Sequence, residues 1–123
     1  MKVCILGNSL SSLALAKALV NKNLYVDLWT SKKNNRPDKS RTIGISKSNV
    51  DFFNKHVINI EKISWKLNKI EIFTDNLKNE KLINFENSNY ELFSILKNFR
   101  LFEILEKSLF KSKYFKKIYQ SMT

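Results

Sequence analysis

The stretch MKVCILGNSLSSLALAKALVNKNLYVDLWT, residues 1–30, decides the fold of this chain. Its first apolar run, Lys2–Leu6, stops at Gly7 and is typical of a buried strand, because parallel strands covered on both faces have continuous apolar sequences. From Leu10 to Val20, apolar residues recur instead at helical spacing. Leu24–Trp29 is a second strand-like run. This order of strand, helix and strand predicts a βαβ unit with a right-handed crossover.

Single residues in this stretch support the same prediction. Ser9 or Ser11 is a suitable N-cap for the helix. Asn23 is suited to end it, because asparagine tolerates the left-handed conformation. Cys4 lies within the first strand and is expected to be a small buried residue. It is also the only cysteine, which excludes an internal disulfide.

The rest of the chain alternates strand-like and helical segments. Lys47–Val57 and Asn98–Leu109 carry apolar residues at helical spacing and are predicted to be helices. Arg41–Ser46 is short and mixed in character. The remaining segments are predicted to be non-helical: a polar loop at Thr30–Ser40, a strand at Leu67–Thr74, a turn at Asp75–Lys78, a hairpin partner at Lys81–Phe85 and a strand at Phe93–Leu96. Together they predict a three-layer α/β fold with a small antiparallel patch around Leu67–Phe85.

Composition limits the class of protein. The chain has 123 residues, of which 43% are hydrophobic and 12% aromatic, and this excludes a disordered chain. No apolar run reaches the roughly 20 residues of a membrane span, and no signal peptide is recognisable, so we expect a cytoplasmic location. The net charge is +11, with 19 Lys against 3 Arg. The lysines are spread along the chain, which indicates a solvated basic surface and no nucleic-acid partner.

The loop after the first strand is the strongest chemical signal. Dinucleotide-binding loops place glycines at their first, third and sixth positions, where they allow a tight turn, close approach of the pyrophosphate and close packing of the helix. Backbone amides at the helix N-terminus then bind the phosphates. Here Gly7 holds the first position, while Ser9 and Ser12 hold the others, and Thr30 stands where an acid would bind the ribose. On the loop alone, a nucleotide site and an α/β unit that merely packs remain equally open.

A more specific pattern follows at Asp38–Ser46, DKSRTIGIS, which leads into a predicted helix. This stretch resembles the Asp-x-x-Arg motif of FAD-dependent aromatic-ring hydroxylases, with the ubiquinone-biosynthesis hydroxylases as the closest likeness. Asn68–Asp75 resembles the family's next strand, and Ser94–Asn98 resembles its following strand-to-helix segment. The likeness covers nearly the whole chain but only about the first third of a family member.

The resemblance implies a Rossmann-like FAD-binding βαβ unit, truncated, with a partial site for FAD. It divides the chain into part of the FAD-binding domain (1–61), the first strands of a substrate domain (62–96) and a helix that returns to the FAD-binding domain (97–123). It assigns no catalytic residue and no metal ligand to this chain. The cofactor-binding residues that it implies are Gly7, Asn8, Ser9, Leu10, Ser12, Thr30 and Arg41.

The family's activity is hydroxylation of an electron-rich aromatic ring, such as a quinone precursor, with NADPH or NADH as the reductant. The chain departs from the family's pattern at Ser9, Ser12 and Thr30, which replace residues that would hold the flavin nucleotide. In addition, Lys97 replaces the glutamate expected before Asn98. The family's later Gly-Asp motif lies beyond Thr123. We therefore expect weak FAD binding and no hydroxylase activity from the chain alone.

Two other functions compete with this one. Thr30-Ser31-Lys32-Lys33 would suit the 2′-phosphate of NADP in a nicotinamide-binding domain. The tail Lys107–Thr123 has five lysines, no acid and interleaved aromatic residues. Such a tail would suit an interfacial helix that binds an anionic surface, including peripheral contact with the inner membrane. A helix that packs against other parts of the enzyme is the preferred interpretation of this tail.

The remaining candidate residues are assigned to packing. His56 and Cys4 are the only histidine and cysteine, so neither a catalytic triad nor a metal cluster is available. Trp29 and Trp65 are expected to pack. A further set is expected to be partly uncovered, awaiting a downstream segment or a partner chain: Leu101, Phe102, Leu105, Leu109 and Phe115.

Overall fold

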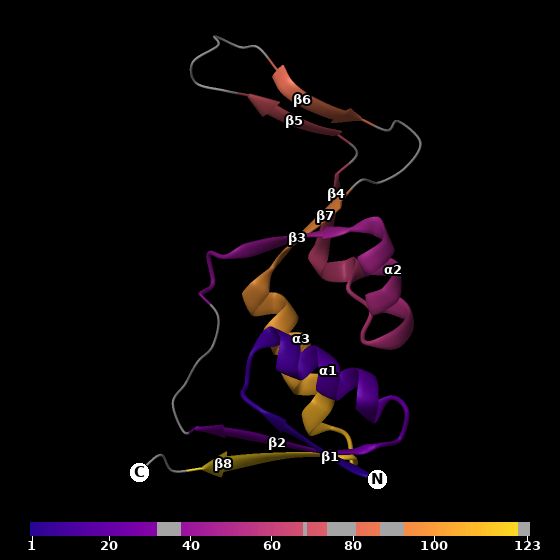
Figure 1. The fold of residues 1–123 in the computed structure, drawn as a ribbon, viewed down its shortest axis with the longest axis vertical. Coiled ribbons are helices and arrows are strands. Elements are labelled where there is room, and N and C mark those ends of the chain that lie inside the picture. The colour runs from indigo at the N-terminus through magenta and orange to yellow at the C-terminus, as the bar shows by residue number, and fades with distance from the viewer. Residues whose placement is uncertain (32–37, 68, 74–80, 87–92, 121–123) are drawn as a thin grey trace.

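A computed structural model of the chain describes residues 1–31, 38–67, 69–73, 81–86 and 93–120. In these residues three α-helices are interspersed among the strands, as Figure 1 shows. In chain order they are β1 (Lys2–Leu6), α1 (Leu10–Val20), β2 (Tyr25–Ser31), β3 (Thr42–Ser46), α2 (Lys47–His56), the 3₁₀ turn η1 (Glu61–Ile63), β4 (Ser64–Leu67), β5 (Lys69–Phe73), β6 (Lys81–Glu86), β7 (Phe93–Lys97), α3 (Asn98–Phe110) and β8 (Phe115–Gln120).

A three-stranded parallel sheet with the order β1-β2-β8 forms one end of the molecule. β2 lies in the middle, and its Val26 and Leu28 are fully buried. Both α1 and α3 contact this sheet and pack against each other on one side of it (Figure 1). The crossover from β1 through α1 to β2 is the predicted βαβ unit.

The hydrophobic core lies between this sheet and the two helices and continues toward α2. Its side chains alternate along each strand, because successive residues of a strand point to opposite faces. On α3 they recur every three or four residues, which places them on one helix face. The buried apolar residues are Ile5, Leu13, Ala16, Val20, Val26, Leu28, Ile45, Val50, Val57, Ile60, Leu96, Leu101, Phe102, Leu105 and Leu109.

Two antiparallel sheets extend the molecule away from the parallel sheet. β7 is the centre of a three-stranded sheet with the order β3-β7-β4, and β5 pairs with β6 as a hairpin beyond it (Figure 1). The fold-class prediction of an α/β chain with an antiparallel patch is therefore confirmed. The hairpin is also confirmed, although the strand expected over Leu67–Thr74 is two strands with different partners. The turn expected at Asp75–Lys78 lies outside the described residues.

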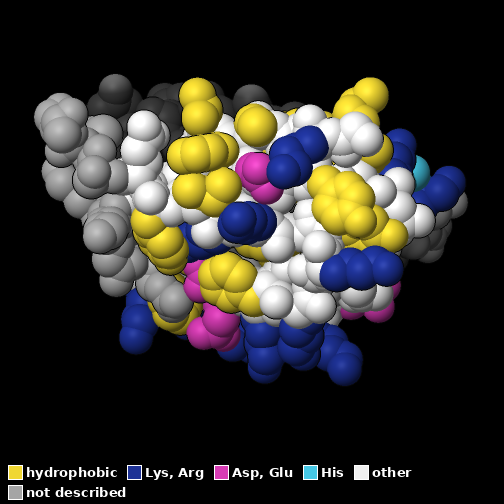
Figure 2. Space-filling view, turned by 90° about the horizontal axis from the view of Figure 1, so that it is seen from below, with side chains coloured by type: hydrophobic (Ala, Val, Ile, Leu, Met, Phe, Trp, Pro, Cys, Tyr) yellow, Lys and Arg dark blue, Asp and Glu magenta, His cyan; other side chains and the backbone are white. Residues whose placement is uncertain are grey.

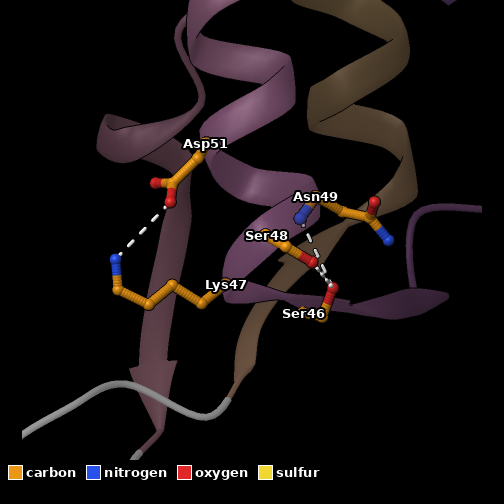
Figure 3. Close-up of polar contacts among 5 residues, drawn as sticks. All are labelled: Ser46, Lys47, Ser48, Asn49 and Asp51. Atoms are coloured by element: carbon orange, nitrogen blue, oxygen red, sulfur yellow. Dashed lines mark hydrogen bonds and ion pairs between the residues drawn. The ribbon is translucent and has the colours of Figure 1, made fainter.

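Helix α2 begins directly where β3 ends. The Ser46 hydroxyl accepts from the backbone amide of Asn49 at 3.4 Å and lies 3.2 Å from the Ser48 hydroxyl, as Figure 3 shows. Lys47 and Asp51 form an ion pair of 3.5 Å on the exposed face one turn on. At the far end of α1, the Asn21 amide donates to the carbonyls of His56 and Val57, which ties the ends of α1 and α2 together.

No described element covers the second face of the parallel sheet, which corrects the three-layer prediction. On β1 the inward residues pack against the helices, whereas Cys4 is exposed and Leu6 is 81% exposed. The prediction of a buried Cys4 is wrong, since an apolar run of this length does not reveal which face of the strand is covered. Figure 2 looks onto this face and shows hydrophobic side chains mixed with lysines and carboxylates.

The tail prediction is wrong in its second half. Helix α3 ends at Phe110, and Phe115–Gln120 is a strand that pairs in parallel with β2. The core side chains of α3 expected to be partly uncovered are at most 2% exposed, because α1, β7 and β8 pack against this helix. Trp65 was expected to pack but is 57% exposed.

Candidate functional site

The loop from β1 to α1 turns sharply at Gly7. Gly7 has a φ of +109°, a conformation that residues with a side chain rarely adopt. Its amide donates to the carbonyl of Trp29 at 2.8 Å and so holds the loop against the end of β2. Glycine at this position is therefore required by the backbone.

Serine residues occupy the positions where glycine is usual. The Ser9 hydroxyl caps α1 by accepting from the Ser12 amide at 3.2 Å, and it also lies 3.1 Å from the Ser12 hydroxyl. This confirms Ser9 as the N-cap, and the positive φ of Asn23 confirms the end that was predicted for this helical segment. The two hydroxyls are directed at one another, so phosphate binding here depends on the backbone amides of the first turn, which holds no acidic residue.

Thr30 lies near the end of β2, beside this loop. Its side chain is 8% exposed and points to the same side of the sheet as Leu28, toward the core. The hydroxyl donates to the Ser31 carbonyl at 3.4 Å. In this position the side chain does not present a surface acceptor for a ribose. Lys32 and Lys33, considered for a 2′-phosphate, lie outside the described residues.

Arg41 lies on a separate turn before β3. The Arg41 amide donates to the Asp38 carbonyl at 3.2 Å, and the Asp38 carboxylate accepts from the amide and hydroxyl of Ser40 at 2.9 and 2.8 Å. These hydrogen bonds, with a smaller contribution from the charge of Arg41, lower the pKa of Asp38. The Asp-x-x-Arg stretch is thus an ordered turn that presents Arg41.

Asn98 is a residue that the sequence analysis did not include in the site. Its backbone N–H donates to the Arg41 carbonyl at 3.0 Å, which joins the first residue of α3 to the Arg41 turn. Its side-chain Oδ1 and that of Asn8 are buried oxygens that accept no hydrogen bond from the part of the chain that the structure describes. Figure 1 shows α1 and α3 beginning on the side of the molecule where β2 ends. The sequence signal for Asn98 was its position at the end of Ser94–Asn98, the segment that resembles the family's strand-to-helix segment.

These groups fit the nucleotide half of a dinucleotide cofactor. The helix amides suit a pyrophosphate, and two buried unpartnered oxygens suit the hydroxyl or amino donors of a ribose or adenine, because a buried acceptor without a partner is costly. The Cβ of Ser9 and the inward Thr30 reduce the fit. The described residues hold no group of three or more metal-ligating side chains, and none of the described helices is long and apolar enough to cross a membrane.

The fold is an α/β structure with a Rossmann-like βαβ unit. No family model and no curated protein matches the sequence. Solved structures do share the fold. PqsL from Pseudomonas aeruginosa, described as a probable FAD-dependent monooxygenase, superposes with a TM-score of 0.75 at 14% identity over 97% of this chain. The p-nitrophenol 4-monooxygenase PnpA from Pseudomonas putida gives 0.76 at 12% identity over 96%.

A third structure, HpxO from Klebsiella pneumoniae in complex with FAD and uric acid, gives a TM-score of 0.68 at 13% identity over 95% of this chain. The chain spans about a third of these proteins: 32% of PqsL and of PnpA, and 30% of HpxO. The fold of this chain is therefore that of one part of FAD-dependent monooxygenases.

Proposed function

We propose that this chain holds the adenine and pyrophosphate end of FAD within a flavin-dependent monooxygenase. The observation that carries the proposal is the loop at Gly7, whose positive φ turns β1 into the N-terminus of α1 in a fold shared with an FAD-bound structure. The sequence resemblance at Asp38–Ser46 supports the same cofactor independently of the loop.

Each site residue has a role in this proposal. Gly7 shapes the turn, and the amides of Leu10 and the residues beside it bind the pyrophosphate. Asn8 and Asn98 offer their unpartnered oxygens to the hydroxyl or amino groups of the nucleotide. Arg41 lies on the turn that Asn98 fixes and supplies positive charge near the cofactor. FAD supplies the redox chemistry when it is bound, while these residues bind and orient it.

The wider activity belongs to a larger assembly. We propose that NADPH or NADH is the reductant and that the substrate is a small aromatic compound, such as a ubiquinone precursor. A downstream segment or partner chain would supply the rest of the flavin and substrate sites, since the similar structures are about three times as long. The chain alone should therefore not consume NADPH with added FAD and a phenolic substrate. We place the assembly in the cytoplasm.

The test is a titration of the 123-residue chain with FAD, followed by flavin fluorescence. Weak, saturable binding is expected. Ser9→Gly should tighten it, because the change removes a Cβ from the approach to the pyrophosphate and frees the Ser12 hydroxyl. Ser46→Gly is the matched control, since Ser46 also caps a helix and stands away from the loop.

Two outcomes would contradict the proposal: no saturable FAD binding by either the native chain or Ser9→Gly, or an equal response to Ser46→Gly. Binding of NADP without FAD would favour the nicotinamide domain instead. The inward position of Thr30 does not favour that alternative. The interfacial-helix alternative also loses its support, because Phe115–Gln120 is a strand of the parallel sheet.

A further inference from the structure

A cavity of about 240 Å³ lies between the segment η1–β4 and the start of α3. It is lined by Lys62, Ile63, Ser64, Trp65, Lys97 and Arg100. None of the proposed FAD-binding residues lines it. Lys97 ends β7, whose neighbour on one side is β3, which follows the Arg41 turn, and on the other side is β4, which contributes Ser64 and Trp65. The cavity is thus distinct in its lining residues, while Lys97 connects it to Asn98 and the Arg41 turn.

The charge of the cavity is entirely positive. Three of its six lining residues are cationic and none is acidic. Among the residues that the structure describes, no ion pair within 4.0 Å involves Lys62 or Lys97. Arg100 uses one nitrogen, Nη1, in a 2.6 Å ion pair with Glu103. An arginine has five N–H donors, so the guanidinium retains donors for a ligand.

The start of α3 is unfavourable for a helix in isolation. Helices prefer a serine, threonine, aspartate or asparagine N-cap and acidic residues in the first turn, because the N-terminus carries partial positive charge. α3 instead has Lys97 as its N-cap without a side-chain hydrogen bond, and no acid in its first turn. By contrast, α1 and α2 are capped by Ser9 and Ser46. An anion in the cavity would relieve this concentration of positive charge.

Trp65 gives the cavity a flat apolar wall. Its side chain is 57% exposed, so the ring is accessible to a ligand. The volume is below the range of about 300–1,000 Å³ for drug-sized ligands, so a dinucleotide does not fit inside. We propose that this cavity binds a small aromatic anion, with the oxyanion held by Lys62, Lys97 and Arg100 and the ring against Trp65.

The experiment is calorimetric titration of the 123-residue chain with phenyl phosphate, benzoate and inorganic phosphate at fixed salt. Phenyl phosphate and benzoate distinguish a phosphate from a carboxylate as the oxyanion, and inorganic phosphate isolates the contribution of the ring. Saturable binding of at least one aryl anion is expected, tighter than that of inorganic phosphate. The indole N–H resonance of Trp65 should shift during that titration.

Lys97→Gln and Lys62→Gln should each weaken aryl-anion binding about five- to tenfold, as expected for the loss of one partly exposed charge-assisted hydrogen bond. Lys111→Gln is the matched control: it removes the same charge at the opposite end of α3 and should change binding less than twofold. Trp65→Leu should weaken aryl-anion binding and leave inorganic phosphate unaffected. Circular dichroism would verify that each variant is folded.

Three results would overturn the proposal. Absence of saturable binding would remove the site, and an equal effect of Lys111→Gln would assign binding to the overall charge of +11. Equal affinity for aryl anions and inorganic phosphate would remove the role of Trp65. Ser9→Gly should leave aryl-anion binding unchanged, so this result and the FAD titration can fail independently of each other.

Discussion

Gly7 and Gly44 are the only glycines of the chain, and they differ in what the backbone demands of them. Gly7 has a φ of +109°, and an added Cβ would meet the Ser12 hydroxyl at an ordinary 3.6 Å. The cost of a side chain at Gly7 therefore comes from backbone conformation. Gly44 lies in β3 and does not have a positive φ. A Cβ added there would lie 4.0 Å from Phe93 Cδ1.

We predict that Gly7→Ala lowers the free energy of unfolding by about 1–3 kcal/mol through backbone strain alone. Gly44→Ala should be neutral or slightly stabilising, because alanine restricts the unfolded chain at no cost in the native state. Urea denaturation measures both. Equal destabilisation by the two changes would contradict a special conformation at Gly7.

Asp38 makes a pH-dependent contribution to the Arg41 turn. Its pKa is lowered, first by the Ser40 amide, then by the Ser40 hydroxyl, and least by the charge of Arg41. A carboxyl with a lower pKa in the folded state stabilises the fold above its unfolded pKa. That stabilisation is lost as the pH falls through the folded value. The turn should therefore loosen only in acid, below the ordinary value of 3.8.

We predict that an NMR titration places the midpoint of Asp38 below 3.8 and that Ser40→Ala moves it part of the way back. The shift is partial because alanine keeps the backbone amide, which is the larger cause. Ser48→Ala, on the neighbouring helix, is the control. If Ser40→Ala leaves the Asp38 midpoint unchanged, the hydrogen bond from the Ser40 hydroxyl does not form in solution.

At the scale of elements, β8 is joined to α3 by a nearly buried ion pair. Lys117 Nζ lies 3.4 Å from Glu106 Oε2, and the two side chains are 10% and 13% exposed. The Lys117 ammonium also lies 5.6 Å from the Phe110 ring centroid and 5.3 Å from that of Tyr119. Loss of one partner from such a pair is more costly than loss of both, because it leaves a charge in a poorly hydrated place.

We predict that Lys117→Met destabilises the chain by about 2–3 kcal/mol, somewhat less than for a fully buried pair. The double change Lys117→Met with Glu106→Leu should recover most of this loss. Lys116→Met, on the opposite face of the same strand, should cost less than 0.5 kcal/mol, as is usual at a surface position. Thermal unfolding of the native chain, both single variants, the double variant and Lys116→Met tests this. Additive effects of Lys117→Met and Glu106→Leu would exclude the pair.

This ion pair also shows why the sequence failed to predict β8. FKKIYQ at Phe115–Gln120 lacks the alternation of a half-buried strand, since Lys117 faces inward and is neutralised only by a residue on α3. By contrast, β1, α1 and β2 have local patterns that determine them, and these were predicted within one or two residues. Parallel pairing of β8 with β2 joins segments some 90 residues apart, which a local pattern cannot reveal.

The same limit applies to the candidate site at the scale of the whole molecule. The Gly7 loop is contiguous and was recognised from its spacing. The contact of Asn98 with Arg41 and the cavity beside Trp65 arise only when β7 brings α3 next to distant segments. The inward direction of Thr30 depends on which face of β2 the helices cover, and both faces are compatible with its sequence.

Cys4 lies on the outer face of the parallel sheet, beside Asp27 of β2 and between Lys2 and Leu6 on the same face of β1. Its thiol can therefore report whether this face is covered. A thiol reagent such as an aromatic disulfide should modify one thiol per folded chain without denaturant, because there is one cysteine and it is exposed. FAD should not change the rate of Cys4 modification, since the Gly7 loop is at the strand ends. A polypeptide that covers this face should slow it. Modification only after unfolding would show that the face is already covered, for example by a second copy. The rate of Cys4 modification therefore measures whether another segment or a partner covers this face of the sheet, without an activity assay.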